Sequence, residues 1–257
     1  METYFQNKVI IITGASSGIG RELAVQSAAQ GACLALAARN VKRLEETAEL
    51  CRQFTDDVRI IQTDISVKDQ CRELIDKTAG EYGRIDILIN NAGMNMSAYF
   101  ENENSLELIE NNMKTNFLGG VYCTYFALPY IKKTRGTIAG IGSLSSKWGF
   151  PTKSGYSASK HAMAGFFDSL RMELRNDDVQ ITMVHPSFIA TGTRAPGKGI
   201  MDTDICAKLI LQAVKRRKRE LIMTVPGKLG LFIKLFAPRL LDAVNAGMMK
   251  NTNLSSR

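Results

Sequence analysis

The fold is decided near the start of the chain, by the stretch KVIIITGASSGIGRELAVQSAAQ at residues 8–30. Its first six residues form an almost continuous apolar run, which is typical of a parallel strand that is buried on both faces. Glycines at positions 14, 18 and 20 then allow a tight turn, and apolar residues resume from Ile19 at helical spacing. This strand, turn and helix are the opening unit of an α/β fold.

The same alternation continues along the chain. Further strands are predicted at 34–38, 58–63, 85–90, 136–142, 179–185 and 221–225, and helices at 42–54, 68–82, 105–132, 156–175 and 204–218. We therefore expect a Rossmann-like, doubly wound parallel sheet of about seven strands with helices on both faces, and a site at the carboxyl ends of the strands.

No linker or low-complexity segment interrupts this series, so we predict a single catalytic domain over residues 1–225 and a C-terminal amphipathic helical extension over 226–257. The glycine-containing stretch 187–201 is the longest irregular segment. A loop of this length in a compact domain is typical of a lid over a site, with simple disorder as the alternative.

Composition narrows the class of protein. No apolar stretch reaches the roughly 18 residues of a membrane span, and the first residues do not resemble a secretion signal, so we expect a cytoplasmic protein, soluble or peripheral at a membrane. The 5 cysteines are widely spaced and lack metal-ligand patterns, which favours reduced thiols and no metal site.

The net charge of +8 arises from the C-terminal part, where residues 208–257 contain eleven Lys or Arg against Glu220 and Asp242. A nucleic-acid-binding protein would combine such charge with a recognition motif, and we find none, so no nucleic-acid partner is expected.

The glycine-rich turn TGASSGIG, residues 13–20, follows the first strand directly and opens the first helix. Free N–H groups and the positive end of a helix can face a pyrophosphate there. An ordinary turn between strand and helix is the alternative, but the position at the first crossover favours a dinucleotide.

The end of the second strand distinguishes between the two nicotinamide dinucleotides. An acidic residue there would hold the adenosine ribose 2′-hydroxyl, whereas a basic one would accept a 2′-phosphate. The residues are Ala38, Arg39 and Asn40, so we predict NADP(H) and expect Arg39 to pair with the extra phosphate. A solvated arginine at a strand end is the alternative.

Tyr156 and Lys160 lie four residues apart in a predicted helix, so both side chains project from one face. A nearby ammonium lowers the pKa of a phenol by favouring the phenolate. Tyr156 could then give or take a hydroxyl proton while a nicotinamide gives or takes hydride.

The combination of motifs resembles the short-chain dehydrogenase/reductase family from Lys8 to about Val225. The matching features, in the order and spacing of that family, are TGASSGIG at 13–20, Asp64, NNAG at 90–93, Asn116, Ser143 and YSASK at 156–160. The resemblance implies that Ser143 hydrogen-bonds the substrate oxygen, Tyr156 exchanges the proton, Lys160 holds the ribose and tunes Tyr156, and Asn116 positions a water.

The resemblance also implies the residues that contact the cofactor. These are Gly14, Ser16, Ser17, Gly18, Ile19, Gly20, Arg39, Asp64, Ile65, Asn90, Ala92, Gly93, Tyr156, Lys160, Pro186, Ile189 and Thr191. One departure is that Ser187 follows Pro186 where the family usually has glycine. His185 before it is interpreted as a strand-end residue and not as a catalyst.

The residues expected to face the substrate are largely apolar, which favours a lipophilic alcohol or carbonyl compound such as a steroid, retinoid or acyl chain. They are Met94, Asn95, Leu144, Trp148, Phe150, Phe188 and Met201. Some of them could instead pack the domain.

The basic run 215–219 and the apolar stretch 226–241 leave two interpretations of the C-terminal extension open. The segment could contact an anionic membrane surface, or it could be a substrate flap or dimer contact with its apolar face buried. Pro238 limits a single straight helix in either case.

These patterns predict an NADP(H)-dependent reductase acting on a carbonyl or secondary alcohol. The resemblance implies a homodimer or homotetramer paired through the helices at 105–132 and 156–175. A catalytically silent nucleotide sensor or scaffold is the alternative from another class, and an epimerase or dehydratase is the alternative among enzymes.

Overall fold

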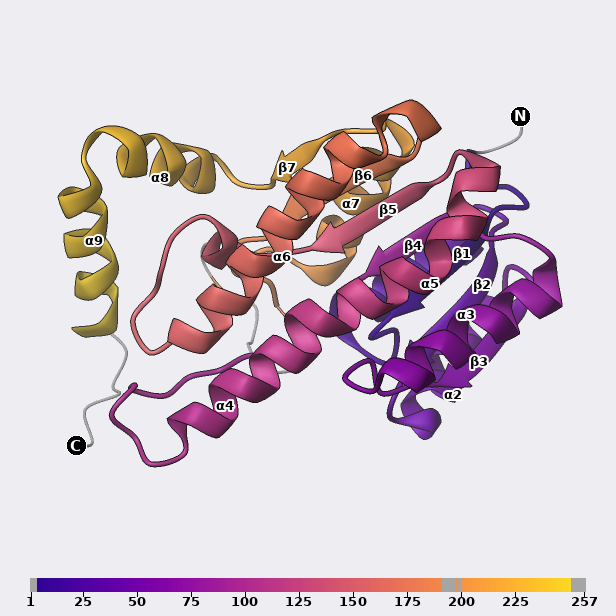
Figure 1. Cartoon of the computed structure of the whole chain (residues 1–257), viewed down its shortest axis with the longest axis horizontal. Helices are drawn as coiled ribbons and strands as arrows, with labels where there is room; N and C mark the ends of the chain where they lie inside the picture. Colours follow the sequence, from indigo (N-terminus) through magenta and orange to yellow (C-terminus); the bar gives the residue numbers. More distant parts are fainter. Residues whose placement is uncertain (1–3, 191–196, 198–199, 251–257) are drawn as a thin grey trace.

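The computed structural model describes residues 4–190, 197 and 200–250, with the side chains of 248–250 left aside. Its centre is one parallel sheet in the order β3-β2-β1-β4-β5-β6-β7 (Figure 1). The strands are β1 Val9–Thr13, β2 Cys33–Ala38, β3 Val58–Gln62, β4 Ile87–Asn90, β5 Thr137–Ile141, β6 Gln180–His185 and β7 Glu220–Ile222. The predicted doubly wound α/β sheet is confirmed, and all seven predicted strands are present.

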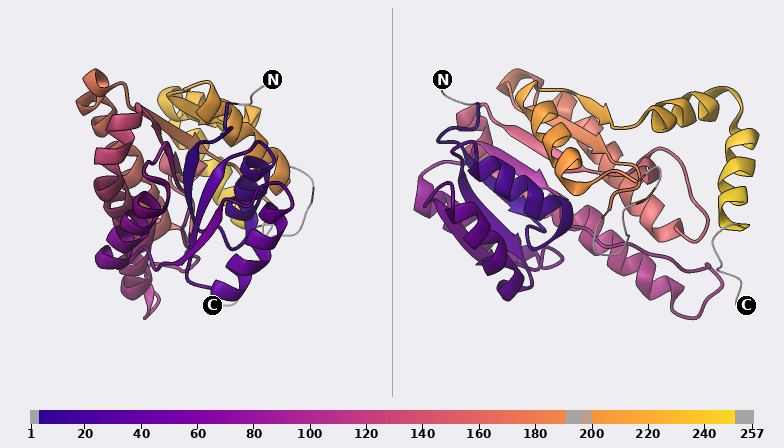
Figure 2. Two further views of the ribbon diagram at one scale, coloured as in Figure 1. Left: turned by 90° about the vertical axis from the view of Figure 1, so that its right-hand side faces the viewer. Right: turned by 180° about the vertical axis from the view of Figure 1, so that it is seen from behind.

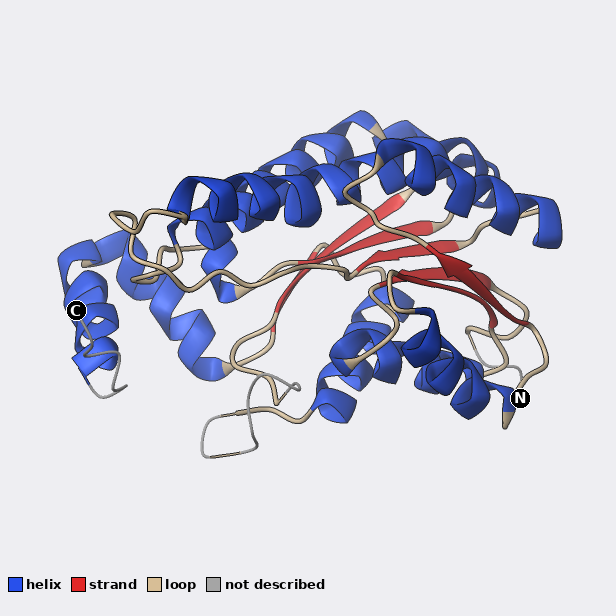
Figure 3. Ribbon diagram, turned by 90° about the horizontal axis from the view of Figure 1, so that it is seen from below, coloured by secondary structure: helices blue, strands red, loops and turns tan. Residues whose placement is uncertain are grey.

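Helices cover both faces of the sheet (Figure 3). One face packs against α1 Gly18–Ala28, α2 Val41–Arg52 and α7 Thr203–Lys215, and the other against α3 Lys68–Tyr82, α5 Gly119–Thr134 and α6 Ser154–Glu173. Strands β1 and β4 are buried at every residue. Continuous burial explains why these strands read as unbroken apolar runs instead of alternating ones.

The predicted helix 105–132 is continuous in space but not regular. It comprises α4 Ser105–Asn112, a π-helical stretch η1 Met113–Leu118, and α5. A π-helical turn inserts an extra residue and changes the direction of the side chains on it, and such turns are frequent at functional sites. Here the turn contains Asn116.

Reversal of the strand order next to β1 places the crevice between the carboxyl ends of β1 and β4. Two short 3₁₀ turns, η2 Leu144–Ser146 and η3 Arg175–Asp177, complete the central region. The turn η2 follows β5 directly and therefore lies at the same edge as the crevice.

The C-terminal helices α8 Val225–Phe236 and α9 Pro238–Lys250 extend beyond the sheet at the carboxyl end of β7 (Figure 2). The side chain of Thr224 caps α8 by accepting from the backbone N–H of Gly227 at 3.2 Å. A new helix begins at Pro238, as its fixed backbone angle predicts. Within the described residues, no helix is both long and apolar enough to span a membrane.

Candidate functional site

The glycine-rich turn after β1 is built by close backbone contacts. Gly14 and Gly18 have positive φ angles of 69° and 54°. A Cβ at Gly20 would lie 2.2 Å from the carbonyl oxygen of Gly14, and one at Gly14 would lie 2.8 Å from Cα of Ala92. The turn therefore needs glycine for both conformation and space, and it presents the first N–H groups of α1, which lack intrahelical acceptors.

Thr13 and Asn91 brace this turn against β4, and the sequence did not single either of them out. Thr13 Oγ1 accepts from the backbone N–H groups of Asn91 and Ala92, both at 3.0 Å. Asn91 Nδ2 donates to the carbonyl oxygen of Thr13 at 2.9 Å. Asn91 belongs to the NNAG motif, so the motif was the available signal, but only the contact identifies which asparagine binds the turn.

Arg39 is exposed immediately after β2, at the edge where the adenosine end of a dinucleotide would lie. Its backbone oxygen accepts from Gln62 Nε2 at 3.2 Å. Asn40 caps α2, because its Oδ1 accepts from Arg43 N at 3.0 Å. Asn40 is thus structural, while the Arg39 side chain projects from an ordered strand end.

The residues expected near the adenosine lie along the same edge. Asp64 Oδ1 accepts from the backbone and hydroxyl of Ser66 at 2.9 and 2.7 Å, which orders the turn after β3. Ile65 is buried against Gly119, where a Cβ would lie 2.7 Å from its side chain and 2.8 Å from its backbone oxygen. Asn90 is also buried and donates to Thr124 Oγ1 at 3.0 Å.

Ser143 is held at the end of β5 by several hydrogen bonds. Its backbone N–H donates to Ser146 Oγ at 3.1 Å, and its hydroxyl accepts from the backbone N–H of Ser145 at 3.2 Å. Neighbouring backbone bonds, from Gly142 N to Val184 O at 2.7 Å and from Leu144 N to Pro186 O at 3.0 Å, tie this loop to β6.

Tyr156 and Lys160 lie on the face of α6 that turns toward Ser143. Burial raises the pKa of the Tyr156 phenol, and the Ser143 hydroxyl lowers it in part. Burial lowers the pKa of Lys160 to about 8. Lys160 Nζ lies 5.9 Å from the centre of the Tyr156 ring and donates to Ile141 O at 2.9 Å. Burial thus disfavours the charged form of both groups, which raises the pKa of the phenol and lowers that of the ammonium.

Asn116 connects the π-helical turn to the loop after β4. Its Oδ1 accepts from Met94 N at 2.7 Å, and its Nδ2 lies 2.9 Å from Met94 O and 3.0 Å from Ser159 Oγ. A Cβ at Gly93 would lie 3.1 Å from Asn116 Oδ1 and 3.4 Å from Lys160 Nζ. The structure therefore places Asn116 and Lys160 beside Gly93, Lys160 beside Tyr156, and Tyr156 beside Ser143.

Ser159 is a further buried residue of this group that the sequence did not assign. Its hydroxyl donates to the carbonyl oxygen of Tyr156 at 2.8 Å and receives Nδ2 of Asn116. It lies inside the quoted YSASK motif, but spacing alone does not reveal that it joins two other members of the site.

The residues after β6 form the neck of the predicted lid. Ile189 is buried and forms a bridge with Met201, and Ala190 N donates to Met201 O at 2.8 Å. Pro186 is buried at the end of the strand. Thr191 and most of the predicted lid lie outside the described residues.

The predicted substrate-facing residues separate into two groups. Phe150 stands between Trp148 and Phe188, with ring centres 6.0 and 6.5 Å apart. Leu144 and Trp148 are buried in a cluster with Leu241 of α9, so they pack the domain as well as line its edge. The polar exception, Asn95, accepts from Lys153 Nζ at 3.0 Å.

The C-terminal helices have one packed face and one exposed face. Gly230 of α8 lies against Trp148, where a Cβ would approach the indole to 2.9 Å. The opposite side exposes large apolar residues, namely Val225, Leu229, Phe232, Leu235, Phe236, Leu240 and Val244. The basic run 215–219 lies at the amino end of β7, whereas this apolar face begins beyond its carboxyl end.

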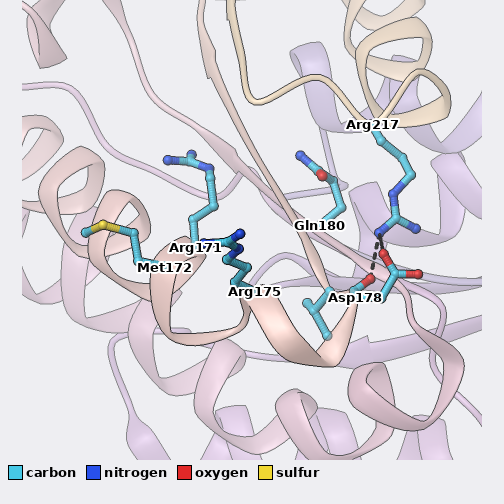
Figure 4. Close-up of a pocket in the computed structure, with 7 residues that line it drawn as sticks. Arg171, Met172, Arg175, Asp178, Gln180 and Arg217 are labelled. Atoms are coloured by element: carbon cyan, nitrogen blue, oxygen red, sulfur yellow. Dashed lines mark hydrogen bonds and ion pairs between the residues drawn. The ribbon is translucent and has the colours of Figure 1, made fainter.

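A separate hollow of about 510 Å³ lies at the amino end of β6 (Figure 4). It is lined in part by Arg171, Arg175 and Arg217, and Arg217 pairs with Asp178 at 2.7 Å. Its residues include none of those proposed for the cofactor or for catalysis. The motif residues named above lie instead at the carboxyl ends of the strands.

Comparisons with known proteins agree with this geometry. A family model described as short chain dehydrogenase matches residues 8–198. The chain is 38% identical to 11-beta-hydroxysteroid dehydrogenase 1A of Arabidopsis thaliana, over 97% of this chain and 80% of that protein. It is 35% identical to a dehydrogenase/reductase SDR family protein 7-like of Dictyostelium discoideum, over 94% and 81%.

Solved structures give the same result. An alcohol dehydrogenase from the archaeon Thermococcus sibiricus, complexed with 5-hydroxy-NADP, superposes with a TM-score of 0.78 and 30% identity, over 85% of this chain and 96% of that one. A short chain dehydrogenase/reductase from Burkholderia phymatum in complex with NAD gives a TM-score of 0.84 at 23% identity, over 93% and 96%, and supports the fold alone.

Proposed function

The chain belongs to the short-chain dehydrogenase/reductase family, and we propose from this premise that it is an NADP(H)-dependent reductase of a lipophilic carbonyl compound. The observation that carries the proposal is the convergence of Ser143, Tyr156, Lys160 and Asn116 at the crevice beside the glycine-rich turn. These four groups provide the proton transfer and the oxygen-binding that carbonyl reduction requires.

In this proposal the nicotinamide, when bound, supplies a hydride to the carbonyl carbon. The phenol of Tyr156 gives its proton to the carbonyl oxygen, which becomes the hydroxyl of the product. Ser143 binds that oxygen, and the Lys160 ammonium favours the phenolate left behind. The hydrogen bonds from Asn116 to Ser159 and from Ser159 to the Tyr156 carbonyl hold the π-helical turn η1 against α6.

Replacement of Tyr156 by phenylalanine tests the role of the phenol. We expect Tyr156→Phe to lower kcat by about 100-fold or more, because general acid catalysis contributes about 10²- to 10⁴-fold. NADPH consumption is measured by absorbance, with Tyr125→Phe, an exposed tyrosine of α5, as the matched control. Equal turnover in wild type and Tyr156→Phe would contradict the proposal, and absence of turnover in wild type would favour the silent nucleotide sensor.

The preference for NADP(H) is proposed from Arg39. Its guanidinium projects from the end of β2, where no carboxylate is present in the sequence Ala38-Arg39-Asn40 to repel a 2′-phosphate. We expect wild type to bind NADPH more tightly than NADH, and Arg39→Ala to weaken NADPH about 10- to 100-fold while leaving NADH unchanged.

Nicotinamide fluorescence titration measures both affinities. Arg52→Ala, at the opposite end of α2 and paired only with Glu45 at the surface, is the matched control and should leave the preference intact. Equal affinity of wild type for both dinucleotides would show that Arg39 does not select the cofactor.

The substrate class is proposed from the neighbouring rings of Trp148, Phe150 and Phe188, and from the steroid dehydrogenase names of the relatives. Phe150 and Phe188 are apolar rings beside the catalytic loop, and they suit a flat, lipophilic carbonyl compound such as an 11-keto steroid. A panel of an 11-keto steroid, retinal and a long-chain aldehyde, assayed with NADPH, tests this. Turnover of the aldehyde alone would contradict a flat substrate.

The exposed face of α8 and α9 is proposed to contact a membrane surface. Phe232 is 60% and Leu235 72% exposed on one side of α8, and Lys228 beside them is exposed as well. Apolar residues flanked by cations enter the headgroup region of anionic bilayers. Phosphatidylserine vesicles should sediment wild type but not the double variant Phe232→Ser/Leu235→Ser, whereas Phe100→Ser, an exposed loop change, should behave as wild type.

The same double variant separates this proposal from self-association. We propose a homodimer through α5 and α6, which expose Tyr125 and Met172 respectively, both well before α8 in the chain. Loss of the dimer in Phe232→Ser/Leu235→Ser, measured by light scattering, would assign the apolar face of α8 to subunit contact instead.

A further inference from the structure

Behind the catalytic loop lies a buried histidine that the mechanism above does not use. His185 ends β6, is fully buried, and has both ring nitrogens near oxygen atoms. Nδ1 lies 3.2 Å from the carbonyl oxygen of Ser143, and Nε2 lies 2.8 Å from Glu220 Oε1. The ring thus stands between the catalytic loop after β5 and the first residue of β7.

The ring fits because of glycine at position 142. A Cβ there would lie 3.2 Å from His185 Nδ1 and 2.7 Å from Ser146 Oγ. Glu220 and His185 belong to adjacent strands, and Glu220 pairs with Met183, two residues before His185 and on the same face. Such diagonal neighbours are within reach of long side chains.

The contact of His185 Nδ1 acts on the peptide group between Ser143 and Leu144. The neighbouring backbone is already tied to β6 through Gly142 and Leu144, which sets the position of the loop. The Ser143 carbonyl and the Leu144 N–H belong to one planar peptide group, so the bond from Leu144 N to Pro186 O and the contact of the carbonyl with His185 hold the same plane from two sides. That carbonyl accepts from Ser146 N at 2.9 Å and lies 3.2 Å from His185 Nδ1, and its peptide group is attached to the Cα that carries the Ser143 hydroxyl.

A charged chain extends this contact to the C-terminal helices. Glu220 also pairs with the ammonium of Lys147, just after η2, and Lys234 of α8 donates to the backbone oxygen of Lys147. Lys147 is mostly shielded, with 19% of its side chain exposed, and Glu220 is 36% exposed. The chain therefore runs from the surface of α8 to the fully buried His185.

We propose that His185 is a positioning residue that, supported by Glu220, holds the carbonyl of Ser143 and so directs the Ser143 hydroxyl toward Tyr156. This inference rests on the proposed function, because it requires Ser143 to bind the substrate oxygen. It also assigns a role to His185, which directly precedes the Pro186-Ser187 pair where this chain departs from the usual pattern of the family. The wider consequence is a link between the C-terminal helices and the catalytic serine.

Three substitutions test the contact. His185→Leu removes both polar contacts, His185→Asn keeps an amide donor at about the place of Nδ1, and Glu220→Gln removes only the charge behind the ring. We expect kcat to fall about 30-fold, 3-fold and 5-fold respectively, with the affinity for NADPH unchanged within about 2-fold. A histidine that only fills space could not be replaced by the smaller asparagine without loss of activity.

The decisive measurement is the double-variant cycle with Ser143→Ala, using NADPH and the panel compound that is reduced fastest. If His185 acts through Ser143, His185→Leu should cost less than about 2-fold in the Ser143→Ala background. An equal loss in both backgrounds would overturn the proposal. If His185→Leu does not fold, the same double-variant cycle can be run with Glu220→Gln, because Glu220 is partly exposed and contacts the outer side of the His185 ring.

The pH profile gives a second readout. The Ser143 hydroxyl lowers the pKa of Tyr156, so a misdirected hydroxyl should leave it higher. For reduction, the rate falls as Tyr156 loses its proton, and this fall should move to higher pH in His185→Leu, as it should in Ser143→Ala. An unmoved profile in His185→Leu together with a moved one in Ser143→Ala would contradict the proposal.

The outer link is tested on α8. Lys234→Met should lower kcat by about 2-fold, whereas Lys77→Met, at an exposed position of α3, should not. The proposed function and this inference fail separately: full activity of Tyr156→Phe would reject the reductase mechanism, while an inactive Tyr156→Phe with an additive Ser143–His185 cycle would reject only the positioning role.

Discussion

The two halves of the sheet build their parts of the site in different ways. On the side of β1, β2 and β4, the candidate nucleotide site consists of backbone packed against backbone, as at Gly20 and Gly14. On the side of β5, β6 and β7, the site consists of side chains that hold one another, as in the group of Ser143, His185 and Glu220. The first half should be sensitive to added atoms and the second to lost ones.

The largest expected effect is on the first half. Gly20→Ala places a Cβ 2.2 Å from the carbonyl oxygen of Gly14, so the turn must shift. We expect a loss of about 2 to 3 kcal/mol in the free energy of unfolding and loss of measurable NADPH binding. Denaturant unfolding and fluorescence titration measure the two.

The matched control is Gly80→Ala in α3, where a Cβ would meet nothing within 4 Å. It should stabilise the protein by about 0.5 kcal/mol, because alanine is the better helix former. Equal stability of Gly20→Ala and Gly80→Ala would contradict the view that the glycine-rich turn is sensitive to added atoms.

A smaller effect of opposite sign is expected at Lys160, where burial lowers the pKa to about 8 from an ordinary 10.5. The folded protein therefore binds this proton less tightly than the unfolded chain, and the cost is complete below pH 8 and disappears as the pH rises to 10.5. Lys160→Met should abolish turnover yet raise the free energy of unfolding at pH 7 by about 2 kcal/mol.

Unfolding of the apo protein between pH 7 and 10.5 measures this difference. The advantage of Lys160→Met over wild type should shrink as the pH rises, since wild type is then relieved of its buried charge. A variant that is less stable than wild type at pH 7 would mean that the bond from Lys160 to Ile141 O outweighs the burial of charge.

The smallest effect on stability is expected at Glu220. The contact of His185 Nε2 at 2.8 Å, with Lys147 as the second partner, lowers the pKa of Glu220 to about 2. The stability that this pairing contributes is present above pH 4.5 and is lost as the pH falls toward 2. At pH 6 the free energy of unfolding of Glu220→Gln should thus be lower than that of wild type. The difference should be less than about 1 kcal/mol, because the pair is partly exposed, and it should vanish near pH 2.

Glu110→Gln is a suitable control, because Glu110 lies on an exposed helix face and its distance from Lys114 is 3.9 Å. It should show no such dependence on pH. A large loss of stability in Glu220→Gln would indicate that the charged chain is structural, and it would weaken the case for a positioning role of His185.

The strands and most helices could be predicted from the sequence. Buried parallel strands appear in it as short apolar runs, and the helices between them as apolar residues at helical spacing. The prediction for 105–132 was less complete: the sequence NNMKTNFLGG contains no proline, and its two glycines follow the π-helical turn at 113–118 and do not mark where it begins. That turn becomes stable through the tertiary bonds of Asn116 to Met94 and Ser159.

Within the site, motif residues could be named individually but not connected. Thr13, Asn91 and Ser159 contribute hydrogen bonds between segments that lie far apart in the chain, and a pattern of spacing does not contain such bonds. His185 was interpreted as a strand-end residue, which it is, but its partners Ser143 and Glu220 lie 42 residues before it and on the next strand.

The sequence by itself determined the doubly wound sheet, the glycine-rich turn and the family, because apolar periodicity and local steric demands are properties of neighbouring residues. Only the tertiary structure decided which side chains meet at the carboxyl ends of the strands, that Trp148 is shared with the C-terminal helices, and that His185 supports Ser143. These contacts depend on register and packing between distant segments, where displacement by a single residue turns a side chain to the opposite face.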